Sequence, residues 1–227
     1  MNTTFQDFDN EIVKLDLSGK NHHVGNIVEF GNDLIVLFNG TDYIYIPFEH
    51  ILNLSIAIDK DHKDAISEPL ESPSIASKAN KNDLTLTNVL TQAQGMFVEI
   101  YVTNNQPLHG YISHIMEDYF VFHSPIYKTM IIATKHLKWL IPYSHNQRPF
   151  GLTDHNLSVK PFTKPLLKTI KEQVEKMQNE LVVFNLGEKL HHVGKIKNFN
   201  GLVVEIETAR NVSVFLNLLH IKTIHRV

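Results

Sequence analysis

The stretch that decides the fold is NEIVKLDLSGKNHHVGNIVEF at residues 10–30, because the chain carries it again as NELVVFNLGEKLHHVGKIKNF at residues 179–199. Eleven of the 21 aligned positions are identical, including the run His-His-Val-Gly. A fainter copy lies between them, shifted by 85 residues from the first. Self-similarity at a fixed spacing predicts one structural unit repeated three times.

The three copies share one glycine after the first apolar stretch and one histidine near the end. These repeated positions are Gly25, Gly110 and Gly194 for the glycine, and His50, His136 and His220 for the histidine. Each histidine precedes Ile or Leu at an expected corner before a strand. We interpret both sets as structural, with a histidine ring nitrogen bonding a backbone carbonyl that the bend leaves free.

Each copy has the pattern of a small β unit. In the first copy, apolar and polar residues alternate over residues 12–17, which is typical of a half-buried strand. Gly-Asn-Asp and Asn-Gly-Thr sequences then predict tight turns. After a loop at 18–22, strands are expected at 25–30, 34–38, 43–46 and 50–56, with Pro47 breaking the pairing. The third copy repeats this order.

A short helix is expected before each unit. The clearest starts near Pro165, followed by apolar residues at helical spacing: Leu166, Leu167, Ile170, Val174 and Met177. Before the second copy, Asp83 is the expected cap and Gly95 the expected end. The apolar stripe between them comprises Leu86, Val89, Leu90 and Ala93. Phe5 and Phe8 indicate a shorter version before the first copy.

The sequence therefore predicts a mostly β chain of three repeats, at residues 1–58, 83–143 and 163–227. Residues 59–82 are rich in Ser, Lys, Asp and Glu without periodic apolar residues, so we expect a flexible linker there. Residues 144–162 form a second expected linker.

Composition excludes several classes of protein. The absence of cysteine rules out disulfides, thiol catalysis, iron–sulfur clusters and cysteine-ligated zinc. No apolar run is long enough to span a membrane, and the N-terminal residues lack the pattern of a secretory signal. The net charge of −3 is not that of a basic nucleic-acid binder.

No motif indicates catalysis, and we expect neither enzyme activity nor a cofactor. The chain lacks a P-loop, a nucleophile elbow, a dinucleotide-binding glycine motif and a repeated carboxylate pair. The pairs His22-His23 and His191-His192 raise the alternative of metal binding. Zinc needs three or four convergent ligands, however, so we favour structural histidines and no metal site.

A helix followed by five bent strands, with Tyr43-Ile44-Tyr45-Ile46-Pro47 leading to His50-Ile51, resembles the Sm-like fold, a small open barrel. Three tandem copies, each ending in His plus Ile or Leu, resemble more closely spore coat protein B and related coat proteins of spore-forming bacilli. The family's Gly-Gly-Pro-Glu loop between the first two strands is replaced here by other residues.

This resemblance implies three tandem Sm-like open barrels, each a short N-terminal helix plus five bent antiparallel strands. It implies a non-enzymatic structural protein, made in the cytoplasm and placed in the spore coat. Its partners would be other coat proteins or further copies of itself, with no membrane involved. The alternative is an Sm-like RNA-binding regulator, with Lys189, Lys195 and Lys197 of the basic third copy as candidate contacts.

Charge is unevenly distributed along the chain. Residues 1–58 carry 2 basic and 8 acidic side chains, a sum of −6, whereas residues 163–227 carry 10 basic and 6 acidic, a sum of +4. Open barrels leave unpaired edge strands, which invite pairing with another copy. We therefore expect first-to-third pairing that weakens as salt rises.

Overall fold

The computed structural model of the 227-residue chain describes residues 8, 11–57, 75, 84–103, 106–144, 147, 149–152, 165–189 and 192–227. The chain falls into two compact units, one made of residues 1–93 and 138–147 and the other of residues 94–137 and 148–227. The linker expected at 59–82 lies outside the described residues except for Ile75, as do Asp83 and most of 144–162.

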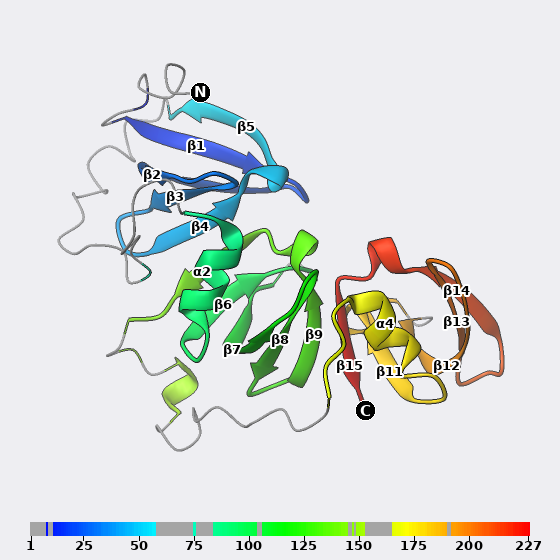
Figure 1. Cartoon of the computed structure of the whole chain (residues 1–227). Coiled ribbons are helices and arrows are strands. Elements are labelled where there is room, and N and C mark those ends of the chain that lie inside the picture. Colours follow the sequence, from blue (N-terminus) through cyan, green and yellow to red (C-terminus); the bar gives the residue numbers. More distant parts are fainter. Residues whose placement is uncertain are drawn as a thin grey trace. The chain divides into compact units, whose positions relative to one another are not determined.

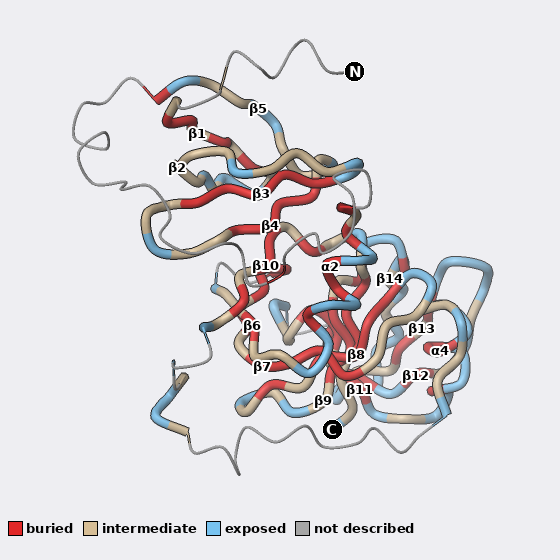
Figure 2. Tube along the Cα trace, turned by 60° about the vertical axis from the view of Figure 1, so that its left-hand side comes forward, coloured by how far each residue is buried: buried red, intermediate tan, exposed pale blue. Residues whose placement is uncertain are grey.

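The first unit is built on an antiparallel sheet of six strands in the order β10-β4-β3-β2-β1-β5, of which β1 to β5 are labelled in Figure 1. Their bounds are β1 (Ile12–Leu17), β2 (Asn21–Phe30), β3 (Leu34–Phe38), β4 (Tyr43–Pro47), β5 (Ile51–Ile56) and β10 (Trp139–Pro142). Strands β3 and β4 are buried along most of their length (Figure 2). Strand β10 belongs to the second repeat in sequence, yet it lies in this unit.

The second unit contains nine antiparallel strands in the order β14-β13-β12-β11-β15-β9-β8-β7-β6. From the second repeat come β6 (Phe97–Tyr101), β7 (Leu108–Ile115), β8 (Tyr119–Ser124) and β9 (Lys128–Ala133). From the third come β11 (Leu181–Phe184), β12 (Val193–Asn200), β13 (Val203–Glu207), β14 (Ser213–Asn217) and β15 (Thr223–Arg226). The prediction of a mostly β fold is thus confirmed.

The repeats share one strand plan. The first is ordered β5-β1-β2-β3-β4 and the third β15-β11-β12-β13-β14, while β6 to β9 of the second form the same successive hairpins. The second strand of each repeat has a register shift at the equivalent place, around Val28, Ser113 and Lys197. A 3-10 turn then precedes each fifth strand, at η2 (Phe48–His50), η4 (Thr134–His136) and η8 (Leu218–His220). The common order predicted from the repeats is confirmed to this extent.

Three strand boundaries of the first repeat differ from the sequence prediction. Strand β5 begins at Ile51 rather than at His50, because His50 belongs to the 3-10 turn η2. Strand β2 begins at Asn21, because Asn21 already pairs with Leu17, so the expected loop at 18–22 is shorter. Strand β4 includes Pro47, which stands opposite Leu34. A proline is compatible with the last position of a strand, where the missing N–H breaks no further ladder bond.

Helix α2 (Leu86–Ala93) buries the predicted stripe of Leu86, Val89, Leu90 and Ala93, which confirms that prediction. Helix α4 (Ile170–Glu175) begins later than the expected start near Pro165. Thr169 is its N-cap, and Thr169 and Glu172 form a reciprocal capping box that fixes the start at Ile170. Neither described helix is long and apolar enough to cross a membrane.

Candidate assembly interface

The three repeated glycines occupy places where a side chain would collide with the neighbouring strand. A Cβ atom would lie 2.2 Å from the Phe38 carbonyl oxygen at Gly25, 2.1 Å from that of His123 at Gly110, and 2.6 Å from that of Glu207 at Gly194. Side-chain carbons do not approach backbone oxygens so closely. The glycines therefore allow the second and third strands of each repeat to come together.

Two strand junctions join consecutive repeats. In the first unit, β10 of the second repeat pairs with β4 of the first, and Leu140 stands opposite Tyr45. In the second unit, β15 of the third repeat pairs with β9 of the second, and Ile224 stands opposite Ile131. The two pairs are equivalent, because Leu140 and Ile224 each follow the closing histidine by four residues. Each junction thus joins a fourth strand to the next repeat's fifth strand.

The second junction is also a hydrophobic core. Tyr119, Val121 and Ile131 of the second repeat belong to the same buried cluster as Phe184 and Ile224 of the third. Burial of this apolar surface is the main contribution to stability that such a contact offers. The third repeat is therefore packed against the second rather than only tethered to it.

A helix–turn contact accompanies each junction. In the first unit, the backbone N–H of Leu86 donates to Oδ1 of Asp33 at 2.8 Å, which caps helix α2. In the second unit, the N–H of Ile170 donates to Oδ1 of Asp118 at 2.7 Å, at the start of α4. Each carboxylate satisfies an N–H that the first turn of a helix leaves free.

Sequence reasoning missed these aspartates. Asp33 and Asp118 lie at the same position of their repeats, in the turn between the second and third strands, and this recurrence was the available signal. The third repeat carries Leu202 at that position, and Leu202 is exposed. No capping aspartate thus stands at the equivalent position of the third repeat.

Strand β5 of the first unit and strand β14 of the second unit have one partner strand each among the described residues, and we call these two strands the open edges (Figure 1). Leu52 on β5 is 70% exposed and Phe215 on β14 is 66% exposed. Natural sheets usually protect free edges with charged residues or proline. Neither open edge contains either kind of residue.

Phe215 is the third member of an equivalent set. Its counterparts, Tyr45 on β4 and Ile131 on β9, are 1% and 3% exposed, and each lies on a strand that pairs with the fifth strand of the following repeat. The cross-strand neighbour of this residue is Val36 in the first repeat, Val121 in the second and Glu205 in the third. In the third repeat, the exposed Phe215 therefore stands opposite the carboxylate of Glu205, where the other two repeats have a buried valine.

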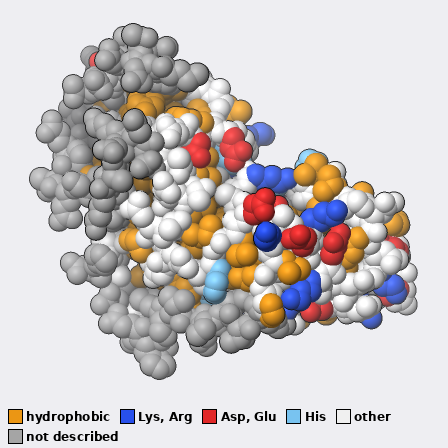
Figure 3. Space-filling model, in the orientation of Figure 1, with side chains coloured by type: hydrophobic (Ala, Val, Ile, Leu, Met, Phe, Trp, Pro, Cys, Tyr) orange, Lys and Arg blue, Asp and Glu red, His pale blue; other side chains and the backbone are white. Residues whose placement is uncertain are grey.

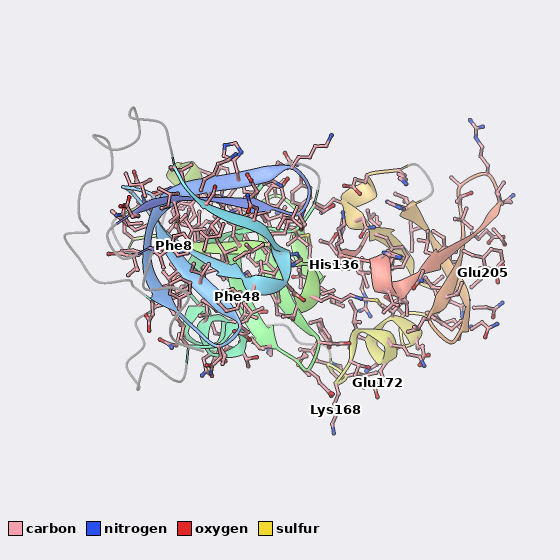
Figure 4. All side chains as sticks on the ribbon, turned by 90° about the horizontal axis from the view of Figure 1, so that it is seen from above. Phe8, Phe48, His136, Lys168, Glu172 and Glu205 are labelled. Atoms are coloured by element: carbon pink, nitrogen blue, oxygen red, sulfur yellow. The ribbon has the colours of Figure 1, made fainter. Side chains whose placement is uncertain are left out.

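Ser213 Oγ donates to one oxygen of Glu205 at 2.6 Å, and Asn198 Nδ2 donates to the other at 3.2 Å. These bonds lower the pKa of the Glu205 carboxyl, the bond from Ser213 most strongly. Figure 4 shows Glu205 on the strands of the third repeat. The carboxylate is thus held ionised beside Phe215.

Comparison with known proteins gives the family. A protein of Bacillus subtilis (strain 168), described as uncharacterized protein YwrJ, is 36% identical over 220 residues, which cover 96% of each chain. The chain belongs to the YwrJ family. Residues 169–224 match the family model called YwrJ third domain, so that domain starts at the α4 cap, Thr169, and extends into β15.

The closing histidines of this YwrJ-family chain lie in three different settings. Nε2 of His136 is 3.0 Å from the Leu219 carbonyl oxygen, a contact that bridges the second and third repeats. Nδ1 of His50 is 3.3 Å from Ser18 Oγ. His220 is exposed, and its backbone carbonyl accepts a bond from Asn185 Nδ2.

The histidine pairs show no convergence on a metal site where the structure describes them. No group of three or more potential metal ligands occurs among the described residues, and His191 lies outside them. His23 packs against Trp139 edge-on, with ring centroids 4.6 Å apart. Burial lowers the pKa of His23 to about 4, so this imidazole is neutral at pH 7.

The three lysines that are candidate RNA contacts differ in their surroundings. Lys189 and Lys195 are exposed, whereas Nζ of Lys197 lies 3.2 Å from Oε2 of Glu207. On the face seen in Figure 3, basic and acidic side chains of the third repeat are interspersed rather than gathered into one patch. An electrostatic groove for a nucleic-acid backbone would require a continuous basic surface.

Proposed function

We propose that this YwrJ-family protein is a non-enzymatic assembly protein of the spore coat that acts through protein–protein contacts of three Sm-like repeats. The Sm-like part of the proposal is supported by the order fifth-first-second-third-fourth in repeats 1 and 3, and by the bend at each second strand. The coat assignment is supported by the resemblance of the repeats to spore coat protein B, and by a relative from a Bacillus.

The observation that carries the proposal is the pair of open edges. Two fourth strands and two fifth strands are already joined inside the chain, while one of each is left with exposed apolar side chains and no charge. An edge of this kind binds another strand through main-chain hydrogen bonds, with side-chain packing adding specificity. A protein with such edges is suited to assembly.

The buried polar groups of the described core support a structural role. The hydroxyl of Tyr45 donates to the Ile75 carbonyl at 2.8 Å, and that of Tyr119 donates to the Leu167 carbonyl at 2.7 Å. Burial raises the pKa of both hydroxyls, to about 12 for Tyr119 and further for Tyr45. Both groups therefore stay protonated, and each hydroxyl binds a later segment of the chain to its sheet.

Localisation tests the proposal. In a Bacillus subtilis strain whose YwrJ is replaced by this chain with a fluorescent tag, we expect fluorescence around the developing spore and the protein in extracts of spore coats. Uniform fluorescence in growing cells, with none in purified spores, would contradict the coat assignment. Retardation of single-stranded RNA that weakens steeply with salt and is lost in Lys195→Glu would favour the RNA-binding alternative instead.

A further inference from the structure

The internal strand junctions indicate which kind of strand each open edge would pair with. Each junction places a fourth strand against the fifth strand of the following repeat in an antiparallel pair. The open edge β14 is a fourth strand without a fifth strand paired to it among the described residues, and the open edge β5 is a fifth strand without a fourth strand paired to it there. One chain thus carries both halves of the same type of junction, and neither half is paired within the described part of the chain.

We propose that β14 of one molecule pairs with β5 of a second copy of this chain, in the register of the internal junctions. This inference rests on the proposed assembly function and names its partner. Ile131 corresponds to Phe215, and Ile224 corresponds to Leu54, by position relative to the closing histidines. The Ile131–Ile224 pair therefore predicts Phe215 opposite Leu54 of the second copy, with Val214 opposite Ser55.

The exposed side chains agree with this pairing. Val214 and Leu216 are partly buried against the core of their own unit, whereas Phe215 points outward at the place where Ile131 is covered by the third repeat. On β5, Leu52 and Ile56 are the exposed apolar residues. Pairing would remove apolar surface from both open edges and satisfy their free backbone groups.

The contact is head-to-tail, because the two open edges are different surfaces. After two molecules join, one β5 and one β14 remain free, so further copies can add. The junction between molecules lacks one feature of the internal junctions, since Leu202 replaces the aspartate that would cap a helix. We therefore expect association weaker than the packing of consecutive repeats within the chain.

The absence of cysteine allows a direct test of the register. Full-length Ser55→Cys is mixed with full-length Val214→Cys under mild oxidation. Residues opposed in an antiparallel pair have Cα atoms about 4.5–5.5 Å apart, within disulfide range. Ser55→Cys mixed with Asn217→Cys is the matched control, because a shift of three residues moves the thiols about 10 Å apart.

We expect a covalent dimer in the first mixture and at least tenfold less in the control. Phe215→Glu should weaken self-association at least about tenfold in sedimentation velocity, because it places a charge in an apolar contact. Ile126→Glu alters another exposed apolar residue, 62% exposed in the turn between β8 and β9, and should leave association within about twofold.

Three outcomes would overturn the inference: equal cross-linking in both mixtures, self-association unchanged by Phe215→Glu, or a strict monomer at all concentrations tested. Thermal unfolding of each variant separates lost association from lost folding. A strict monomer that is still found in the spore coat would refute pairing between copies while leaving the proposed coat function standing. Self-association through this register in a protein that is absent from spores would refute the coat function while leaving the pairing between copies standing.

Discussion

The backbone N–H of Ile170 lies 2.7 Å from Oδ1 of Asp118, although 52 residues separate them in sequence. Asp118 lies in the turn between β7 and β8, and Ile170 is the first residue of α4. The carboxylate therefore holds the helix of the third repeat on the sheet of the second. Asp33 and Leu86 make the same bond in the first unit, so the relationship recurs in the first two repeats.

Replacing Asp118 with alanine should lower the free energy of unfolding by about 1 kcal/mol, because the N-terminal N–H of α4 loses its acceptor. Asp118→Asn keeps a side-chain oxygen and should cost less. Urea unfolding followed by circular dichroism measures both variants. Equal losses in the two would show that charge, rather than the hydrogen bond, holds the helix.

The repeated glycines predict that glycine-to-alanine variants lose different amounts of stability. Gly110→Ala should cost at least about 3 kcal/mol or prevent folding, since its Cβ would lie 2.1 Å from the His123 carbonyl oxygen. Gly194→Ala, with 2.6 Å to Glu207, should be milder. Gly95→Ala is the matched control: its φ of +79° is unfavourable for alanine, by about 1–2 kcal/mol, but no atom lies within 4 Å. Soluble yield and thermal unfolding rank the three, and a control as harmful as Gly110→Ala would contradict the steric explanation.

The buried imidazole of His23 predicts a loss of stability in mild acid. Its pKa is about 4 in the folded chain, against 6.5 in the unfolded chain, so the unfolded chain binds more protons between these values. Stability should fall as pH drops from 6.5 to 4, by on the order of 3 kcal/mol at most. Burial lowers the pKa of His225 as well, and this adds a loss in the same direction.

His23→Phe should flatten this pH dependence, because phenylalanine keeps a ring against Trp139 without a titrating group. Trp139 is the one tryptophan of the chain, so its fluorescence reports urea unfolding at pH 7 and pH 5. If the variant loses as much stability as the wild type over this range, His23 is not the group responsible.

The first strand was predictable from sequence, because a half-buried strand alternates its residues locally, as residues 12–17 do. Strand β3 is buried at every position and does not alternate, so the turn sequences on either side of it were the local signal. The later start of α4 was harder to predict from sequence. The start depends on the capping box of Thr169 and Glu172, and Pro165 is also suited to a first helical position. The pairing of β4 with β10 joins residues far apart in the chain, Tyr45 and Leu140, and no local pattern encodes it. The two strand junctions are therefore known only from the structure, although the recurrence of Asp33 and Asp118 can be seen in the sequence.

The charge distribution of the sequence predicts electrostatic pairing of the first and third copies, whereas the open edges predict pairing through apolar contact. Neither β5 nor β14 contains a charged residue, and Lys197 is paired with Glu207. We now expect self-association to change little between low and high salt, because apolar contact and backbone pairing are weakly screened. A steep loss of association in salt would restore the electrostatic explanation.

Glu205 provides the last prediction, because it stands beside Phe215 where the other repeats have buried Val36 and Val121. Covering this carboxylate on association removes it from water, which opposes contact. Glu205→Val should therefore tighten self-association about tenfold in sedimentation velocity. The hydrogen bonds that it loses, from Ser213 and Asn198, are exposed, so the monomer should lose little stability.

Glu175→Val makes the same chemical change on α4, where Glu175 forms only a surface ion pair with Lys171, and should leave association unchanged. Adding Phe215→Glu to Glu205→Val should abolish the gain, because the valine would then face a charge across the strands. If both valine variants tighten association equally, general surface hydrophobicity is the cause. If Glu205→Val alone does so, the carboxylate limits how strongly one copy receives the next.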